Sequence, residues 1–450
     1  MFNYFQLQDE LLQNENINCN SSRQLDHRKQ RCRFIIACVL LICFIMFPLC
    51  LLTINQQRRQ HQQSEQQQEE QRLVCYYSAS DRIQLSLLDV PGDLCTHINI
   101  GAAELNNCTV TLSPRLEQVL QNETHLYKAA NPHVKLLLWI GGADSGHQFA
   151  VMVGNHAQRK QFLRSLKAIM QKYRSLDGID LDWEFPSAYA NERIHFSQLL
   201  HEIRMEWTRE KRDDNLLSLA VAAPEGIAFY AYDIREINLY VDYVNLMTYD
   251  FHFYRDDMPF TGLNAPLAAR PQEKSIMGTF NINYTAHWWL KNGLEPHRLV
   301  IGLPTYGHSF TLVNPFNTRI GAPASGYGKC GQLGFTTLSE TCACADGYLK
   351  PIYTFDNDTC SPYLSSLGEW ISYESKSSFV CKVNFIKSLK VGGLMIFSLN
   401  SDDLSNTCGY NPKSSGKPVF PLIEAAKEIL MAEKLEQQKR EASWELEWVP

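Results

Sequence analysis

Eight apolar runs recur between residues 73 and 399, and they constrain the fold more than any other feature of the chain. Each run is long enough for one strand, and amphipathic stretches such as 158–174 and 192–211 lie between them. Strands that alternate with helices in this way are typical of a parallel sheet. The runs are Leu73–Ser78, His97–Ala102, Val134–Gly141, Gly178–Glu184, Leu216–Ala223, Val241–Tyr249, Leu299–Thr305 and Gly393–Leu399.

These eight units predict an α/β fold, a (β/α)8 barrel whose chemistry lies at the carboxyl ends of the strands. One interval, from Tyr306 to Val391, is too long for an ordinary crossover and contains five cysteines. We therefore expect a small α+β insertion at about 306–391, between the seventh and eighth strands. It should form one wall of a groove.

The fourth run carries three acids at alternate positions, namely Asp180, Asp182 and Glu184, and it ends at Pro186. Side chains on a strand alternate between its two faces, so the acids share one face and apolar residues occupy the other. Like charges this close repel, and at least one acid should hold a proton near neutral pH. A solvated acidic edge strand is the alternative, which the large apolar residues on the opposite face disfavour.

This stretch resembles the D-x-x-D-x-D-x-E signature of glycoside hydrolase family 18, the chitinases and their relatives. The resemblance implies that Glu184 is the acid/base, that Asp182 holds the substrate's N-acetyl group, and that Asp180 tunes the charge of Asp182. The substrate's own carbonyl oxygen would be the nucleophile, with retention at the anomeric carbon, so neither a metal nor an organic cofactor is expected. We expect Asp180 and Asp182 to raise the pKa of Glu184 and to give a bell-shaped pH profile on the acidic side of neutral.

The resemblance extends over residues 73 to about 430, which we assign to a catalytic domain at 73–432. Met247-Thr248-Tyr249-Asp250 is similar to the family's M-T-Y-D motif, which implies a catalytic role for Tyr249 and sugar contacts from Met247 and Asp250. A core tyrosine is the alternative for Tyr249. The other substrate-binding positions that the resemblance implies are Tyr77, Gly141, Gly142 and Phe397.

Three positions depart from the family pattern. Trp139 stands where a serine is usual on the third strand, and Ala143 and Phe397 stand where tryptophans normally face the sugar. The acid/base is retained, but efficient hydrolysis of long crystalline chitin is less well supported. We therefore predict an endo-β-N-acetylglucosaminidase acting on chitin, chito-oligosaccharides or a related glycan. A non-catalytic chitinase-like lectin is the alternative, and an adhesion scaffold has no positive feature beyond the anchor described next.

An uncharged apolar segment, residues 34–54, is long enough to cross a bilayer. Basic residues are more frequent before it than after it, so the positive-inside rule places residues 1–33 in the cytoplasm. We therefore predict a single-pass type II membrane protein with a Gln-rich stalk at 55–72 and a catalytic domain that is extracellular or luminal. Secretion after cleavage of a signal peptide is the alternative. Residues 433–450 form a charged C-terminal tail.

Nine of the fourteen cysteines lie beyond the span, where an oxidising compartment permits disulfides. The family resemblance implies a Cys75–Cys95 bond, and a Cys342–Cys408 bond in which Cys344 is the rival to Cys342. The partners of the others cannot be deduced from sequence, and these are Cys108, Cys330, Cys360 and Cys381. Glycosylation sequons on the same side of the span lie at Asn107, Asn122, Asn283 and Asn357. The net charge of −6 gives no support to a nucleic-acid partner.

Overall fold

The computed structural model describes residues 71–432, apart from 81, 84, 348–349 and 411–415. The predicted cytoplasmic tail, membrane span and all but the end of the stalk lie outside these residues, as does the charged tail at 433–450. Among the described helices, none has the length and apolar character needed to cross a membrane.

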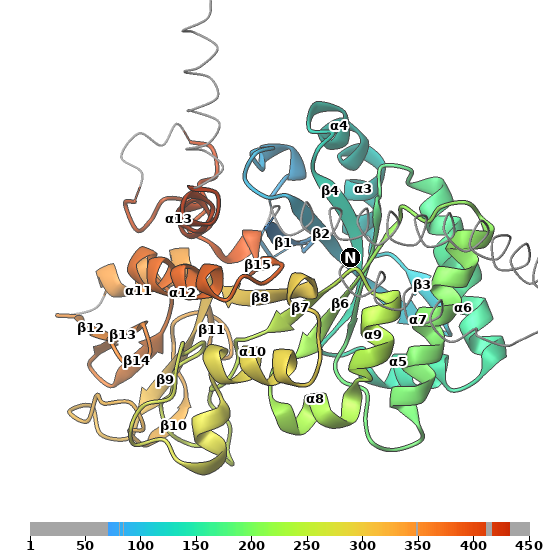
Figure 1. Cartoon of the computed structure of the whole chain (residues 1–450). Coiled ribbons are helices and arrows are strands. Elements are labelled where there is room, and N and C mark those ends of the chain that lie inside the picture. Colours follow the sequence, from blue (N-terminus) through green and yellow to red (C-terminus); the bar gives the residue numbers. More distant parts are fainter. Residues whose placement is uncertain (1–70, 81, 84, 348–349, 411–415, 433–450) are drawn as a thin grey trace, which may run out of the picture. The chain divides into compact units, whose positions relative to one another are not determined.

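Eight parallel strands close into a barrel, as the sequence predicted (Figure 1). Each strand pairs with the next in the order β1-β15-β8-β7-β6-β5-β4-β2, and β1 pairs with β2 to complete the ring. A short strand, β3 (Thr109–Thr111), extends β2 as an antiparallel hairpin that we did not predict. The barrel strands are β1 (Arg72–Ser78), β2 (His97–Asn106), β4 (Lys135–Gly142), β5 (Gly178–Trp183), β6 (Leu216–Ala222), β7 (Tyr243–Met247), β8 (Leu299–Pro304) and β15 (Gly393–Phe397).

Helices follow most strands and surround the barrel. The predicted helix at 158–174 begins two residues earlier, at His156, because the Asn155 side chain accepts the Gln158 backbone N–H as an N-cap. The helices are α3 (Pro114–Asn122), α4 (Thr124–Ala130), α5 (Gly146–Val153), α6 (His156–Lys172), α7 (Glu192–Arg209), α8 (Glu225–Ala231), α9 (Ile234–Tyr240), α10 (Ile282–Lys291), α12 (Lys376–Ser388) and α13 (Pro421–Leu430). Short 3-10 turns are η1 (Leu87–Asp89), η2 (Ser275–Thr279), η3 (Pro296–Arg298) and η4 (Leu399–Ser401).

The predicted insertion between the seventh and eighth barrel strands is a separate antiparallel sheet with one helix. Its strand order is β10-β9-β14-β13-β12, and β11 also pairs with β9. In Figure 1 this lobe lies on the side of the barrel away from α5, α6 and α7. Its elements are β9 (Tyr306–Leu312), β10 (Ala324–Tyr327), β11 (Phe335–Thr337), α11 (Leu338–Gly347), β12 (Ile352–Asp356), β13 (Ser361–Ser366) and β14 (Glu369–Ser372).

The alternation of side chains along each strand produces two separate cores. On β1, Leu73, Cys75 and Tyr77 face outwards and join the large core between the strands and the surrounding helices. Val74 and Tyr76 face inwards and join a smaller, aromatic-rich core within the barrel. Each barrel strand is therefore buried on both faces, which explains why the runs are almost continuously apolar.

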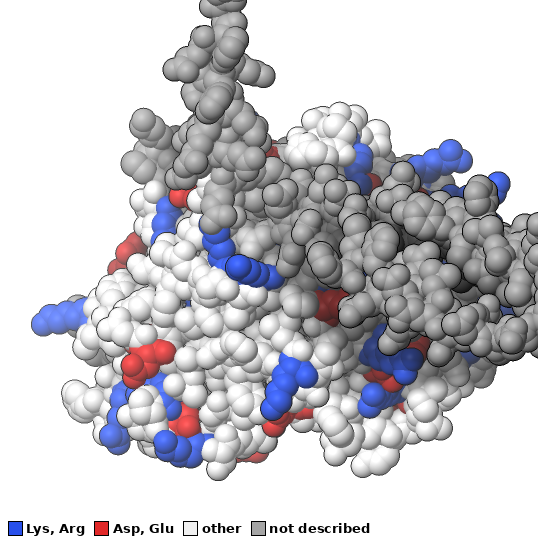
Figure 2. Space-filling view, in the orientation of Figure 1, with Lys and Arg blue, Asp and Glu red and all other residues white. Residues whose placement is uncertain are grey.

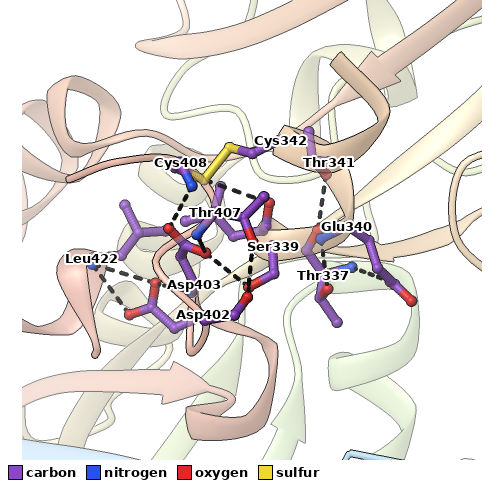
Figure 3. Close-up of a disulfide and its surroundings, with 12 residues drawn as sticks. Thr337, Ser339, Glu340, Thr341, Cys342, Asp402, Asp403, Thr407, Cys408 and Leu422 are labelled. Carbon is purple, nitrogen blue, oxygen red and sulfur yellow. Dashed lines mark hydrogen bonds between the residues drawn. A yellow bond between two sulfur atoms is a disulfide. The ribbon is translucent and has the colours of Figure 1, made fainter. Parts of the chain in front are cut away.

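Two adjacent carboxylates hold the C-terminal part of the domain in place (Figure 3). Asp402 accepts backbone N–H groups from Leu422 and Ile423 at the start of α13, a favourable place for negative charge. Asp403 accepts the backbone N–H of Cys408, whose sulfur is bonded to Cys342. The two side chains thus connect η4 to α13 and to the disulfide at the edge of the inserted lobe.

Four disulfides are present in the described residues. Two are the expected Cys75–Cys95 and Cys342–Cys408 bonds. Cys344, the rival partner for Cys408, is instead bonded to Cys330, and Cys360 is bonded to Cys381. Cys108 is free and buried. The two additional pairs could not be deduced because connectivity depends on the fold of the lobe and not on spacing.

Three of the four sequon asparagines, Asn107, Asn122 and Asn357, are exposed, and Asn283 is half-buried. Figure 2 shows basic and acidic residues intermixed among uncharged ones on the described part of this face. The sequons remain predictions of modification, with access to solvent at each exposed position.

Candidate active site

The three acids of the motif lie at the carboxyl end of β5, between β4 and β6. Asp180 and Asp182 are 0% and 2% exposed and point into the barrel, and Glu184 follows the last strand residue and is partly exposed. Ile179, Leu181 and Trp183 belong to the outer core. A solvated edge strand is thus excluded.

Asp180 lies deepest in the site and is held by three donors. Its Oδ2 accepts the Tyr76 hydroxyl at 2.6 Å, and its Oδ1 accepts the Ser218 hydroxyl at 2.6 Å and the Asn245 amide at 3.0 Å. Burial raises the pKa of Asp180 to about 6, although these hydrogen bonds act in the opposite direction. Its two oxygens are thus fully used by neighbouring strands.

Asp182 has a different set of contacts. The Trp139 indole N–H donates to its Oδ2 at 2.9 Å, and its Oδ1 is buried with no hydrogen-bond partner among the described residues. Burial, followed by repulsion from Glu184 and Asp180, raises the pKa of Asp182 well above its usual range. An unpaired buried oxygen is costly, so a ligand that supplies a donor there would be favoured.

Glu184 is the acid closest to solvent. Burial, followed by the charges of Asp250 and Asp144, raises the pKa of Glu184 to about 7. The direction agrees with our expectation from sequence, but the expected cause was repulsion from Asp180 and Asp182. Desolvation is the larger effect because most of this side chain is shielded from water, although the residue is partly exposed. A carboxyl group with such a pKa is protonated at mildly acidic pH and can donate a proton.

Asp250, in the M-T-Y-D segment, is turned by a left-handed backbone conformation with φ of 56°. Its Oδ1 accepts the Tyr306 hydroxyl and the His308 Nε2–H, both at 2.7 Å, and the Asn264 side chain accepts its backbone N–H at 2.8 Å. Its side chain is 46% exposed. The carboxylate is therefore fixed at the junction between the barrel and the inserted lobe.

Aromatic rings line the barrel interior near these acids. The ring of Tyr249 lies 5.7 Å from that of Phe397 and 6.0 Å from that of Tyr306, centre to centre. Among the described residues, the Tyr249 hydroxyl makes a hydrogen bond only to the Met395 sulfur, at 3.8 Å. Tyr249 is thus part of the inner core, and its hydroxyl has no strong hydrogen-bond acceptor among the described residues.

The two predicted glycines lie at the end of β4, where both have positive φ. A Cβ at Gly141 would lie 2.1 Å from the Asp182 carbonyl oxygen, so this position cannot carry a side chain without movement of β5. A Cβ at Gly142 would lie 4.0 Å from Asp182 Oδ2. Met247 ends β7 and packs against the inner core. The glycines therefore allow β4 to approach Asp182 closely.

One predicted sugar-binding residue is misplaced. Tyr77 is fully buried in the outer core, and its hydroxyl donates to the Leu85 carbonyl, so it does not face the barrel interior. Its neighbour Tyr76 does. The error is one of parity, because adjacent strand residues point to opposite faces and the sequence motif contains two successive tyrosines.

Several residues that hold the acids were not predicted from the sequence, including Ser218, Asn245, Tyr306 and His308. Polar residues within otherwise apolar strands were the available signal for Ser218 and Asn245, since a buried polar group needs a partner. Nothing local indicated that they would meet Asp180. Among the described residues no cluster of three or more His, Cys, Asp or Glu could hold a metal ion.

Comparison with known sequences agrees with this geometry. The profile of Glycosyl hydrolases family 18 matches residues 72–402. The chain belongs to this family. Among curated family members, human chitinase-3-like protein 2 is 31% identical over 373 residues, covering 80% of this chain and 92% of the relative. Mouse chitotriosidase-1 is 29% identical, covering 80% of this chain and 78% of the relative.

Solved structures of family 18 proteins are similarly close. Human YKL-39, described as a pseudo-chitinase with retained chitooligosaccharide binding, matches with a TM-score of 0.73 and 29% identity, over 80% of this chain and 100% of that chain. The Group IV chitinase of Ostrinia furnacalis gives the same TM-score, identity and coverage. The family thus includes both enzymes and proteins described as binding without catalysis, and membership alone does not distinguish them.

Proposed function

We propose that this family 18 protein hydrolyses β-1,4 links next to N-acetylglucosamine in chito-oligosaccharides or a related glycan. One observation carries the proposal. Glu184 has a pKa raised to about 7, and next to it along the same strand face lies Asp182 with an unpaired buried oxygen. A binding protein has no need to keep a partly buried acid protonated beside a second carboxylate.

In the proposed reaction the Glu184 carboxyl proton passes to the glycosidic oxygen as the bond to the anomeric carbon breaks. The carbonyl oxygen of the substrate's own acetamido group bonds to that carbon from the opposite face. Asp182 accepts the acetamido N–H and stabilises the positive charge that develops. The Glu184 carboxylate then takes a proton from a water molecule. The water oxygen bonds to the anomeric carbon and displaces the acetamido oxygen, so that the configuration at this carbon is retained. Neither a metal nor an organic cofactor takes part in these steps.

Neighbouring residues support the roles of these two acids. Tyr249 has a hydroxyl with no strong protein acceptor, which suits donation to the acetamido carbonyl. Phe397 provides an aromatic surface next to Tyr249 and Tyr76, on which a sugar ring can stack.

Glycan binding without cleavage is the second candidate function. It is favoured by the exposed Ala143 and by Phe397, which replace the usual tryptophans and reduce the aromatic area available to a sugar. It is also the property described for human YKL-39. Both candidates predict binding of N-acetylated oligosaccharides and differ in turnover.

The deciding experiment uses a fluorescently labelled chitotetraose with the purified full chain. We expect saturable binding together with steady release of shorter sugars that retain the β configuration at the new anomeric centre. Binding without release over a long incubation would contradict the hydrolase proposal and favour the lectin. Absence of both would contradict the choice of glycan.

We further propose that the domain is held outside the cytosol by residues 34–54, as a type II membrane protein. The downstream disulfides support an oxidising compartment. The chain also contains a sequon upstream of the span, at Asn20, which provides an internal test of orientation.

In a eukaryotic host we expect glycosidase treatment to lower the apparent mass through the downstream sequons and not through Asn20. Replacing Arg28, Lys29, Arg31 and Arg33 with glutamine should reduce this glycosylation because it removes the basic cluster that retains the N-terminus in the cytoplasm. Single Asn→Gln variants assign each site by its mass. Glycan on Asn20 alone would reverse the topology, and loss of residues 1–55 with no membrane-bound form would indicate a cleaved signal peptide.

A further inference from the structure

Trp139 occupies an unusual position within the barrel. It lies opposite Asp180 in the β4–β5 register, yet its side chain reaches the next acid, and its indole N–H donates to Asp182 Oδ2 at 2.9 Å. It is 7% exposed. A tryptophan at this point therefore both fills part of the barrel interior and supplies the one hydrogen bond that the described residues make to the Asp182 carboxylate.

The indole is fixed by the rings and backbone around it. Its ring contacts Tyr76 edge-on at 5.2 Å and Phe397 at 5.7 Å, centre to centre. It also packs against β2, since a Cβ at Gly101 would lie 3.0 Å from Trp139 Cε3 and 2.7 Å from its carbonyl oxygen. These contacts come from three different strands, so the indole N–H has little freedom to leave Asp182.

The Asp180 carboxylate is not bonded to the Asp182 carboxylate. Its two oxygens are used by Tyr76, Ser218 and Asn245, and no hydrogen bond joins the two carboxylates in the described structure. The Asp182 side chain is thus held from the β4 side through one oxygen. The other oxygen, Oδ1, stays buried and unpaired.

We propose that Trp139 is a positioning residue, whose indole N–H holds one oxygen of Asp182 so that the other is free to accept the acetamido N–H of an N-acetylated sugar. This inference rests on the proposed function and assigns to Trp139 a part of the substrate preference. The hydrogen bond favours the ionised form of Asp182, which is the form that accepts from an amide and stabilises positive charge.

Trp139→Phe removes the donor and retains an aromatic ring. We expect about a 10- to 100-fold loss in kcat, the usual effect of losing a hydrogen bond to a charged group, with a much smaller change in KM. The acidic limb of the kcat profile should move to higher pH because the pKa of Asp182 is lowered by the Trp139 bond. The preference for N-acetylated over deacetylated chitotetraose in a binding assay should fall by a similar factor.

Trp183→Phe is the matched control. Trp183 precedes Glu184, but it points into the outer core, where its ring stacks on Phe149 at 5.5 Å and its indole N–H has no partner among the described residues. The same chemical change there should leave the pH profile and the acetyl preference unchanged. An equal effect from both substitutions would indicate a general packing effect and would overturn the proposal.

A spectroscopic test separates this inference from the proposed activity. With 15N-labelled tryptophan in the full chain, the indole signal lost in Trp139→Phe should titrate with pH and move in Asp182→Asn, and the signal lost in Trp183→Phe should not move in Asp182→Asn. A Trp139 indole signal whose chemical shift changes neither in Asp182→Asn nor with pH would overturn the inference. If the hydrogen bond and acetyl preference are present without turnover, the hydrolase proposal fails and the positioning role stands.

Discussion

Replacing Glu184 with glutamine should lower turnover of labelled chitotetraose by about 10²- to 10⁴-fold, the usual contribution of a positioned general acid. Glutamine has nearly the same shape but carries no proton that it can give to the leaving oxygen. Sugar binding should persist, since the residues that line the inner barrel are unchanged. The measurement is kcat and KM for both proteins at mildly acidic pH.

A second, substrate-free readout comes from stability. Because the pKa of Glu184 is raised to about 7 in the folded protein, above its ordinary value near 4.5, ionisation of this group destabilises the fold. Its favourable contribution is complete below the unfolded pKa and is lost as pH rises through about 7. Glu184→Gln should therefore gain stability relative to the parent protein over that window. Equal turnover in the two proteins would contradict the assignment of Glu184 as the acid.

Replacing Asp182 with asparagine should lower kcat by about 10²- to 10³-fold, comparable to removing one preorganised electrostatic group from an active site. It should also shift the pH profile. In the parent protein we expect the alkaline limb of kcat/KM near pH 7, where Glu184 loses its proton. The two carboxylates repel each other, since the Glu184 charge raises the pKa of Asp182, so removing the Asp182 charge should move the alkaline limb of Asp182→Asn to lower pH.

Asp144→Asn offers a matched comparison. Asp144 is exposed, and its charge also raises the pKa of Glu184. Its removal should move the alkaline limb in the same direction, with kcat almost unchanged, and the shift should disappear at high salt. An alkaline limb that stays in place in Asp182→Asn, or moves upward, would show that Asp182 and Glu184 do not interact as proposed.

The local pattern of the chain was sufficient for the barrel and for the acids. Eight apolar runs separated by helical stretches predicted the eight parallel strands, and each observed strand overlaps its predicted run. Period-two alternation in the fourth run placed Asp180 and Asp182 on one face and Trp183 on the other, and the structure shows these to be the inner and outer faces of the barrel. These inferences succeed because the periodicity of a strand and the ending of β5 before Pro186 depend on neighbouring residues alone.

The environment of the acids depended on residues far away in the sequence. Tyr76 is 104 residues from Asp180, and Asn245 is 65 residues from it. Both meet it because closure of the barrel brings β1, β5 and β7 around one interior. No local pattern gives the pairing of strands that are distant in the chain, so the sequence did not show which side chains would meet Asp180.

The sequence by itself determined the strand periodicity and the three-acid face, because each depends on residues that are close together in the chain. Only the tertiary structure decided that Trp139 holds Asp182, that Cys330 pairs with Cys344, and that burial is the main cause of the raised pKa of Glu184. The Trp139 contact joins two strands 43 residues apart, and the Cys330–Cys344 bond, although it spans only 14 residues, depends on how the lobe folds. The raised pKa of Glu184 arises from exclusion of water by the folded structure.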